Sequence, residues 1–207
     1  MSEIDQSYVM VIVILGGYVL GSVPFGLVLT RLAGIGDIRQ IGSGNIGATN
    51  VLRTGNKFLA FLTVLLDGGK GGVAVLLAGV LSPEPTIPFI AGAMAVLGHN
   101  FPIWLKFKGG KGVATSLGTL LAAAWPVGIA VCLAWLLVAL TLRYSSLSAI
   151  ISLGASPVIA WLLMPPPDNL PLAIMAGVLG GLTVVRHQTN IRRLLNGEEP
   201  RIGSKGS

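Results

Sequence analysis

The sequence predicts an all-α, polytopic integral membrane protein with seven transmembrane helices, its N-terminus outside the cell and its C-terminus inside. Apolar residues make up 53% of the 207 residues, charged residues only 11%, and the mean hydropathy is +0.80. A soluble domain carries roughly a quarter charged residues, and a disordered chain needs low hydrophobicity. The single cysteine excludes a disulfide-rich secreted scaffold. We expect one membrane domain over residues 1–207, with a short cytoplasmic tail at about 196–207.

The first apolar run, residues 8–32, is predicted to be a retained membrane span. The residues before it, Ser2-Glu3-Ile4-Asp5, are acidic and no small-residue cleavage site follows, which argues against a signal peptide. Further apolar runs cover residues 58–81, 88–105, 113–142, 146–164 and 171–185.

The run 113–142 is too long for one span, because 30 residues would form a helix of roughly 45 Å against a hydrocarbon core of roughly 30 Å. If it turns at Trp125-Pro126, 13 of the 14 Lys and Arg residues share one side, and only Lys70 lies inside a run. Lys and Arg favour the cytoplasmic side. This distribution predicts two helices, at about 113–124 and 127–142. The first is shorter than a full crossing, so neighbours should shelter it.

The first polar loop on this face, residues 42–50, contains the pattern G-x-G-x-x-G. A dinucleotide fold is not expected, because that pattern requires a strand before it and here it follows a membrane span. Successive small residues still let backbone N–H groups turn toward an anion. Four side chains add hydrogen-bond donors: Ser43, Asn45, Thr49 and Asn50. An ordinary solvated loop with a helix cap at Thr49 or Asn50 explains the loop equally well.

The second polar loop has three lysines within six residues, followed by a helix start. Gly109-Gly110-Lys111-Gly112 lacks the P-loop spacing, so nucleotide hydrolysis is not indicated. A positive-inside anchor near anionic lipid accounts for the lysines at 106 and 108, but not for the glycines or Thr115. Because free N–H groups at a helix start bind phosphate, we expect an anion site around Lys111.

Titratable residues supply further candidates. Asp67 and Lys70 lie three apart on one face of a span, where they can neutralise each other. Charge within a span indicates function by default, so structural and catalytic roles both stay open. His187 is followed by Asn190, which favours a substrate role as donor, anchor or proton-transfer group. His99 is the second histidine candidate.

Several catalytic patterns are absent from the sequence. Neither histidine has an Asp five positions later, and there is no G-x-S-x-G elbow and no Cys/His metal spacing. A Ser-His-Asp mechanism or a metal hydrolase would therefore lack parts. We expect no metal, no cofactor and no nucleic-acid partner.

The chain resembles the bacterial acyl-phosphate:glycerol-3-phosphate acyltransferase family, integral membrane enzymes. The matching segments run in order over nearly the whole chain: Gly21–Gly26, Gly42–Arg53, Leu66–Gly71, Gly98–Pro102, Phe107–Thr115, Tyr144–Ser146, Arg186–Ile191 and Gly197-Glu198. The resemblance implies acyl transfer from acyl phosphate to the 1-hydroxyl of glycerol 3-phosphate, giving 1-acylglycerol 3-phosphate (lysophosphatidate) and inorganic phosphate. It also implies a bacterial inner-membrane location, an active site on the cytoplasmic side and functional coupling to an enzyme that forms acyl phosphate.

The resemblance maps three functional motifs onto residues 43–53, 108–115 and 187–198, the second of them associated with glycerol 3-phosphate. The catalytic candidates are His187, Asn190, Ser43 and Asn45. The phosphate-binding candidates are Arg53, Lys111, Gly110, Gly112, Thr115, Ser145, Ser146, Thr49 and Asn50. Further candidates are Asp67, Lys70 and His99. Both substrates carry phosphate, so a cationic, N–H-rich site fits them, and an activated acyl group lessens the need for a protein nucleophile.

A transporter of an anionic phosphorylated metabolite is the main alternative, because glycine-broken helices and charge within a span are features of transporters. The enzyme is favoured for two reasons. The polar groups gather on one face, and the loops predicted on the other face have little with which to build a second gate. A purely structural membrane scaffold would leave the loop chemistry unexplained.

Overall fold

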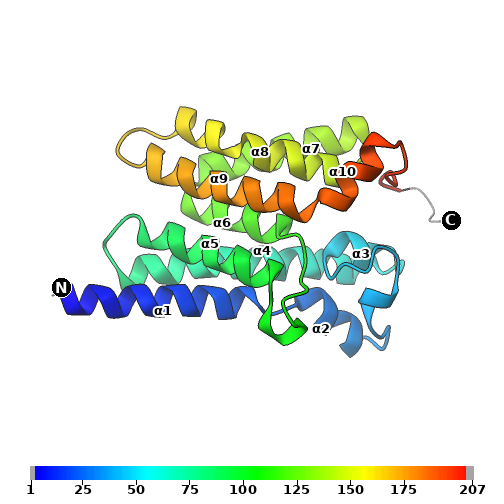
Figure 1. The fold of residues 1–207 in the computed structure, drawn as a ribbon, viewed down its shortest axis with the longest axis horizontal. Coiled ribbons are helices and arrows are strands. Elements are labelled where there is room, and N and C mark those ends of the chain that lie inside the picture. Colours follow the sequence, from blue (N-terminus) through cyan, green and yellow to red (C-terminus); the bar gives the residue numbers. More distant parts are fainter. Residues whose placement is uncertain (1–2, 204–207) are drawn as a thin grey trace.

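The computed structural model describes residues 3–203, which form ten α-helices and two short 3₁₀ helices (Figure 1). Lys205 and the end of the predicted tail, residues 204–207, lie outside the described residues, as does Ser2. In chain order the elements are α1 (Glu3–Gly21), α2 (Phe25–Leu32), η1 (Ile38–Gln40), α3 (Ala48–Leu52), α4 (Lys57–Leu81), α5 (Ile87–Asn100), η2 (Ile103–Leu105), α6 (Val113–Ala123), α7 (Trp125–Leu142), α8 (Ser145–Leu163), α9 (Asn169–Arg186) and α10 (Gln188–Leu195).

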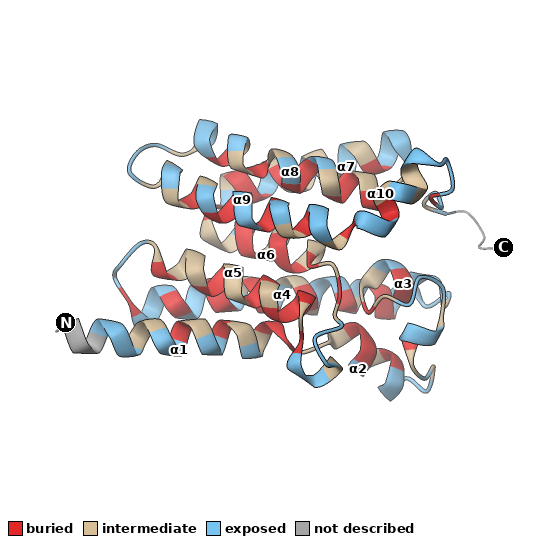
Figure 2. Cartoon of the chain, viewed as in Figure 1, coloured by how far each residue is buried: buried red, intermediate tan, exposed pale blue. Residues whose placement is uncertain are grey.

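The long helices form two groups joined by α6. Helices α1, α4 and α5 pack together on one side, and α7, α8 and α9 pack together on the other (Figure 1). Helix α6 contacts α4 and α5 in the first group and α7, α8 and α9 in the second. The largest apolar core follows this arrangement, with Leu120 of α6 fully buried beside Leu153 of α8 and Leu179 of α9. Buried residues accordingly line the interior faces, and exposed ones the outer faces (Figure 2).

Glycines bring α4 and α6 into close contact. A Cβ added to Gly118 would lie 2.0 Å from the carbonyl oxygen of Gly68, and one added to Gly71 would lie 2.6 Å from Oγ1 of Thr119. Such small residues let helix backbones approach in a membrane, where no hydrophobic force drives helices together. This close packing shelters α6, as the sequence predicted for a helix shorter than a full crossing.

The predicted division of residues 113–142 is confirmed. Helix α6 ends at Ala123, Ala124 is extended with φ −156° and ψ 96°, and α7 begins at Trp125 with a proline in its first turn. Proline fits the first turn because its missing N–H has no partner there in any helix. Gly128 then packs on the backbone of Leu121, so α7 turns back beside α6.

The predicted seven spans are borne out only in part. Among residues 3–203, six segments are long and apolar enough to cross a membrane, and α6, with 11 residues, reaches only about 16 Å. The first segment, predicted as one span over residues 8–32, is also interrupted. Helix α1 stops at Gly21, where a Cβ would lie 2.0 Å from the carbonyl oxygen of Ala95, and α2 starts after Pro24. Proline removes a backbone donor and disfavours a helical residue before it.

The polar loops lie together at one end of the helix bundle, where α2, α3 and α10 are found (Figure 1). Hydrogen bonds between segments far apart in sequence join them. Arg186 donates to the carbonyl oxygens of Gly109 and Gly110, and Thr49 lies 3.4 Å from Ser145, oxygen to oxygen. The arrangement agrees with the prediction that the polar loops share one face.

Candidate functional site

A pocket of about 310 Å³ lies at this polar end. Its nine lining residues come from the first loop, the second loop and the α9–α10 junction: Ser43, Gly44, Asn45, Lys111, Val185, Arg186, Gln188, Thr189 and Arg193. Three of them are cationic and most of the others are polar or lack a side chain. Three motifs predicted from the sequence to form one site therefore meet at one pocket.

Asn50 organises the first loop from within. Its Nδ2 donates to the carbonyl oxygens of Ile38, Ile41 and Asn45 at 2.9, 2.9 and 2.8 Å, while its Oδ1 accepts from the N–H and hydroxyl of Ser43. The residue is only 1% exposed. Asn50 was predicted to donate to phosphate, but its amide is occupied inside the loop, so the structure places it as the loop's internal support.

The remaining polar residues of this loop lie nearer the surface. Ser43 and Asn45 line the pocket, and Oδ1 of Asn45 accepts from the N–H of Gly47 at 2.9 Å. Thr49 is exposed at the rim. Arg53, also exposed, packs its side chain over Gly42, which has φ +55°. A Cβ at Gly42 would lie 2.9 Å from Nη1 of Arg53, so this glycine makes room for the guanidinium.

The second loop is held by its backbone. The N–H groups of Gly109 and Gly110 donate to the carbonyl oxygens of Asn100 and His99, at 3.2 and 3.0 Å. From the other side, the guanidinium of Arg186 donates to the carbonyl oxygens of Gly109 and Gly110, at 2.9 and 3.0 Å. The N–H of Gly110 is therefore not available to an anion, contrary to the expectation from its glycine-rich pattern.

Two more residues of this motif pack against neighbouring helices and do not line the pocket. Gly112 has φ +77°, a conformation that favours glycine, and it lies against the side chain of Asn100. Thr115 is fully buried against Gly71 of α4. Both were predicted to bind phosphate, and the structure instead places them where α6 begins and where α6 meets α4.

Lys111 extends from this loop into the pocket and donates to Oδ1 of Asn190. Burial lowers the pKa of Lys111 to about 8; Glu199 opposes that change, and Arg193, Arg53 and Arg186 add to it. The low pKa therefore reflects burial first and the neighbouring arginines second, with the Glu199 carboxylate acting against both.

That carboxylate, Glu199, was missed by the sequence analysis, which matched its neighbour Glu198 instead. Glu199 accepts from the hydroxyl of Ser146 and the amide of Asn190, both at 2.6 Å, and from Nε of Arg193 at 2.7 Å. Burial opposes its ionisation, but these hydrogen bonds hold the pKa of the Glu199 carboxyl below its usual value. Asn190 and Ser146, predicted site residues, thus belong to one network with Lys111. The sequence did contain a signal for Glu199, because the loops of this face hold few acidic residues among many basic ones.

His187 lies at the junction of α9 and α10 and is 2% exposed. Its Nδ1 lies 2.8 Å from the carbonyl oxygen of Thr183, which can only accept, so Nδ1 carries the proton. Burial, with the charge of Lys111, lowers the pKa of His187 to about 4. The ring is therefore neutral near pH 7, and Nε2 carries a lone pair able to take a proton.

The other three candidates form a separate buried cluster outside the pocket lining. Nζ of Lys70 lies 2.8 Å from Oδ1 of Asp67 and 2.9 Å from Nδ1 of His99. Ser145 lies elsewhere, at the start of α8 beside Thr49. Within residues 3–203, His, Cys, Asp and Glu side chains form no group of three able to hold a metal ion.

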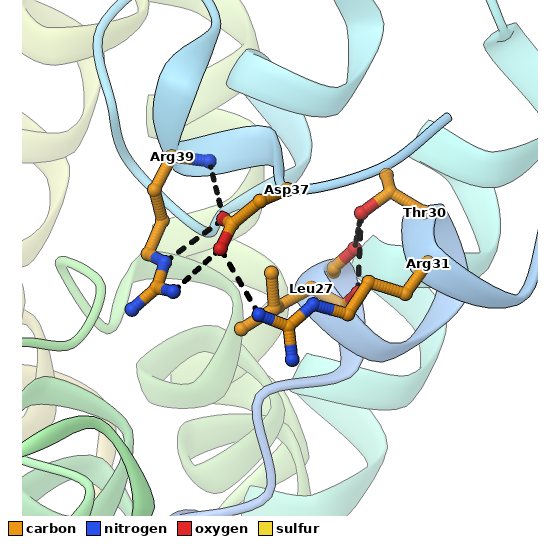
Figure 3. A network of polar contacts seen from close by, with 6 residues as sticks. Leu27, Thr30, Arg31, Asp37 and Arg39 are labelled. Atoms are coloured by element: carbon orange, nitrogen blue, oxygen red, sulfur yellow. Dashed lines mark hydrogen bonds and ion pairs between the residues drawn. The ribbon is translucent and has the colours of Figure 1, made fainter. Parts of the chain in front are cut away.

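A charged cluster anchors the segment that leads into the first loop (Figure 3). Asp37 accepts from Arg31 at 3.0 Å and from Nε of Arg39 at 2.9 Å, and the two guanidinium groups point at it from opposite sides (Figure 3). The Arg39 guanidinium, with Arg31, holds the pKa of the Asp37 carboxyl well below its usual value. These exposed pairs tie α2 to η1 and so set where the first loop begins.

Comparison with known proteins gives a consistent result. Residues 11–197 match the family model described as glycerol-3-phosphate acyltransferase. A glycerol-3-phosphate acyltransferase of Paramagnetospirillum magneticum is 64% identical over 92% of this chain and 92% of its own, and that of Rhodospirillum rubrum is 56% identical over 99% and 96%. The crystal structure of PlsY (YgiH), an integral membrane glycerol 3-phosphate acyltransferase, in its glycerol 3-phosphate form, superimposes with a TM-score of 0.86. It is 37% identical and covers 94% of this chain and 96% of its own.

Asn50→Asp tests the support of the first loop. The substitution removes the amide N–H donors and sets a carboxylate against three carbonyl oxygens. We expect it to destabilise the protein by about 1–3 kcal/mol, the cost of unsatisfied buried polar groups, measured as a lower thermal unfolding midpoint in detergent.

Asn56→Asp is the matched control. Asn56 caps α4 by accepting from the N–H of Leu59, and an aspartate there keeps the acceptor and favours the helix N-terminus. Equal unfolding midpoints for the two variants would contradict the role given to Asn50.

Proposed function

Because the chain belongs to the glycerol-3-phosphate acyltransferase family, we propose that it transfers a fatty acyl group from acyl phosphate to the 1-hydroxyl of glycerol 3-phosphate. The products are 1-acylglycerol 3-phosphate, also called lysophosphatidate, and inorganic phosphate. The observation that carries this proposal is the pocket that joins Lys111, Arg186 and Arg193 at the end of a membrane helix bundle. The crystal structures of PlsY in a glycerol 3-phosphate form and in a lysophosphatidic acid form support the substrate and the product.

The proposed reaction is a direct transfer. The 1-hydroxyl oxygen of glycerol 3-phosphate attacks the carbonyl carbon of acyl phosphate, and the bond from that carbon to the phosphate oxygen breaks. The hydroxyl proton passes to Nε2 of His187 or to the departing phosphate. Acyl phosphate already has a good leaving group, so the cationic site has mainly to position two anions and stabilise the charge that develops.

The contacts suggest how the residues divide this work. Lys111 and Arg53 hold phosphate groups, and Ser43 and Asn45 orient them from the first loop. Asn190 fixes the ammonium of Lys111 and is itself fixed by Glu199. These assignments make Asn190 a positioning residue as well as a candidate contact to substrate.

We further propose that the polar end faces the cytoplasm of a bacterial cell, with the protein in the inner membrane and its N-terminus outside. The support is the concentration of Lys and Arg at this end, as the positive-inside rule requires. A soluble phosphate ester then reaches the pocket from the cytoplasm, and the acyl chain lies between helices in the bilayer. Acyl phosphate has to be supplied by an enzyme that activates fatty acyl groups, to which this enzyme is functionally coupled.

The donor is tested with purified protein in lipid vesicles. We expect lysophosphatidate to form when acyl phosphate and glycerol 3-phosphate are supplied, with one inorganic phosphate released per product. Product formation from acyl-CoA but not from acyl phosphate would overturn the donor. Uptake of glycerol 3-phosphate into vesicles without acylation would favour a transporter.

The orientation is tested by labelling single cysteines in intact cells, in a Cys132→Ser background. A cysteine placed at Ser7 should react with a membrane-impermeant maleimide from outside, and one placed at Lys108 should react only after the cells are opened. The reverse labelling pattern would contradict the proposed orientation.

The phosphate-binding roles are tested by kinetics. Arg53→Ala and Lys111→Ala should each lower kcat/KM at least roughly tenfold, because a lost charged contact is worth about 1.5–3 kcal/mol. Lys106→Ala, which removes an exposed charge of the same loop outside both the pocket lining and the three motifs, serves as the control and should change kcat/KM less than about twofold.

The pH dependence gives a second check on Lys111. Its pKa of about 8 means that the ammonium is charged below pH 8 and loses its proton as the pH rises through that value. The KM for glycerol 3-phosphate should therefore rise several-fold between about pH 8 and 9.5. Lys111→Arg keeps its charge over this range, so its KM should stay flat. A parallel rise in both proteins would assign the effect to another group.

A further inference from the structure

A buried charged cluster lies behind the second polar loop, outside the residues that line the pocket. Asp67 and Lys70 come from α4 and His99 from the end of α5, and they are 2%, 3% and 4% exposed. Burying such groups is expensive unless each polar atom is satisfied. The proposed reaction uses none of them, so their retention needs another reason.

Every donor of the Lys70 ammonium has a partner. Nζ donates to the carbonyl oxygen of Val23 at 2.7 Å, to Asp67 at 2.8 Å and to Nδ1 of His99 at 2.9 Å. An ammonium has three N–H groups, and these three bonds use them all. Nδ1 of His99 also lies 3.5 Å from Oδ1 of Asp67, so this nitrogen faces both members of the ion pair and leaves Nε2 as the other nitrogen of the ring.

His99 places that Nε2 against the second loop. A Cβ added to Gly110 would lie 2.0 Å from Nε2, so the ring edge rests on the α-carbon of this glycine. The backbone oxygen of His99 also accepts the N–H of Gly110 at 3.0 Å. From the other side, Nε of Arg186 donates to the carbonyl oxygen of Gly110. The residue immediately before Lys111 is therefore fixed on three sides.

The same ammonium reaches the segment that leads to the first loop. Val23 lies in the break between α1 and α2, and the ring of Phe25 is 5.6 Å from Nζ of Lys70. Arg31 of α2 then pairs with Asp37, in the segment that leads into the first loop. The Lys70 ammonium thus links the α1–α2 break to the end of α5, from which the second loop starts.

We propose that Asp67, Lys70 and His99 are positioning residues that fix Lys111 in the pocket by holding Gly110. The inference rests on the proposed function in one respect, that Lys111 binds a phosphate group of the substrate. Asp67 fixes Lys70, Lys70 fixes the His99 ring, and the ring fixes the loop. A cluster that only held α4 to α5 would have no need of an imidazole edge in contact with a glycine of the second loop.

Two uncharged variants of His99 separate the loop contact from the buried ion pair. In His99→Gln the side-chain amide reaches the place of Nε2 and keeps the contact with Gly110. In His99→Asn the shorter amide keeps a partner for Lys70 at the place of Nδ1 but cannot reach Gly110. Ser156→Ala is the control, because Ser156 is buried and bonds the carbonyl oxygens of Leu153 and Ala176, far from the second loop in sequence.

The first measurement does not depend on activity. The pH dependence of Lys111 acetylation by trace acetic anhydride, followed by mass spectrometry, reports the pKa of its amine among Glu199, Arg193, Arg53, Arg186 and His187. Wild type, Ser156→Ala and His99→Gln should have a midpoint near 8. A loosened Lys111 is better hydrated, so His99→Asn should move the midpoint toward the ordinary 10.5 by about one unit, a tenfold change in proton affinity.

The second measurement is steady-state kinetics. His99→Asn should raise the KM for glycerol 3-phosphate about tenfold, equivalent to about 1.4 kcal/mol, while the KM for acyl phosphate changes less than about twofold. His99→Gln should recover most of the wild-type value. The inference is wrong if His99→Asn and His99→Gln give the same result in both measurements. It is also wrong if the two variants lower the unfolding temperature but change neither the acetylation midpoint nor the KM. Wild-type protein that does not acylate glycerol 3-phosphate would overturn the proposed function, while the acetylation midpoints would still decide the role of His99.

Discussion

The need to satisfy backbone carbonyl groups wherever the chain leaves a helix near the membrane governs this structure. Inside a bilayer no water is available to pair with these groups, so each one requires a donor from the protein. Lys70 supplies the donor at the break between α1 and α2, and Arg186 supplies two to the second loop. Asn50 supplies the donors of the first loop. Asn50 and Arg186 thereby also fix the two loops that line the pocket.

The cationic residues consequently have two different roles. Lys70 and Arg186 are occupied by carbonyl oxygens, and they position loops. Lys111 lines the pocket and Arg53 is exposed beside Gly42, and these are the two cations proposed to hold phosphate. The separation explains why so many basic residues occur at one end of a protein with so little charge elsewhere. On the proposed function, topology requires some of them, loop geometry requires others, and Arg53 and Lys111 hold phosphate.

The sequence was sufficient for features that depend on period, length and charge. It predicted the division of residues 113–142 because a helix of that length does not fit a bilayer and the basic residues would otherwise fall on both sides. It also predicted that the polar loops share one face. It did not predict the break at Pro24, because an apolar run with one proline can also form a kinked helix. The close approach of Gly21 to Ala95 of α5 at the end of α1 is likewise visible only in the tertiary structure.

Within the site, the sequence did not reveal which polar side chains are buried or already hydrogen-bonded inside the loops. Asn50 and Thr115 have the chemistry to bind phosphate, but burial and neighbouring backbone atoms decide whether they can. Glu199 was missed because a carboxylate appears unsuited to an anion-binding site. Its role follows from the charges around it: burial lowers the pKa of Lys111 most, the charges of Arg193, Arg53 and Arg186 lower it further, and Glu199 opposes them. One carboxylate that pairs with Arg193 and holds Asn190 offsets part of this repulsion and leaves a net positive pocket. The proposed transfer between two phosphate-bearing substrates needs that balance, because too many unpaired cations would destabilise the fold and too many carboxylates would exclude the substrates.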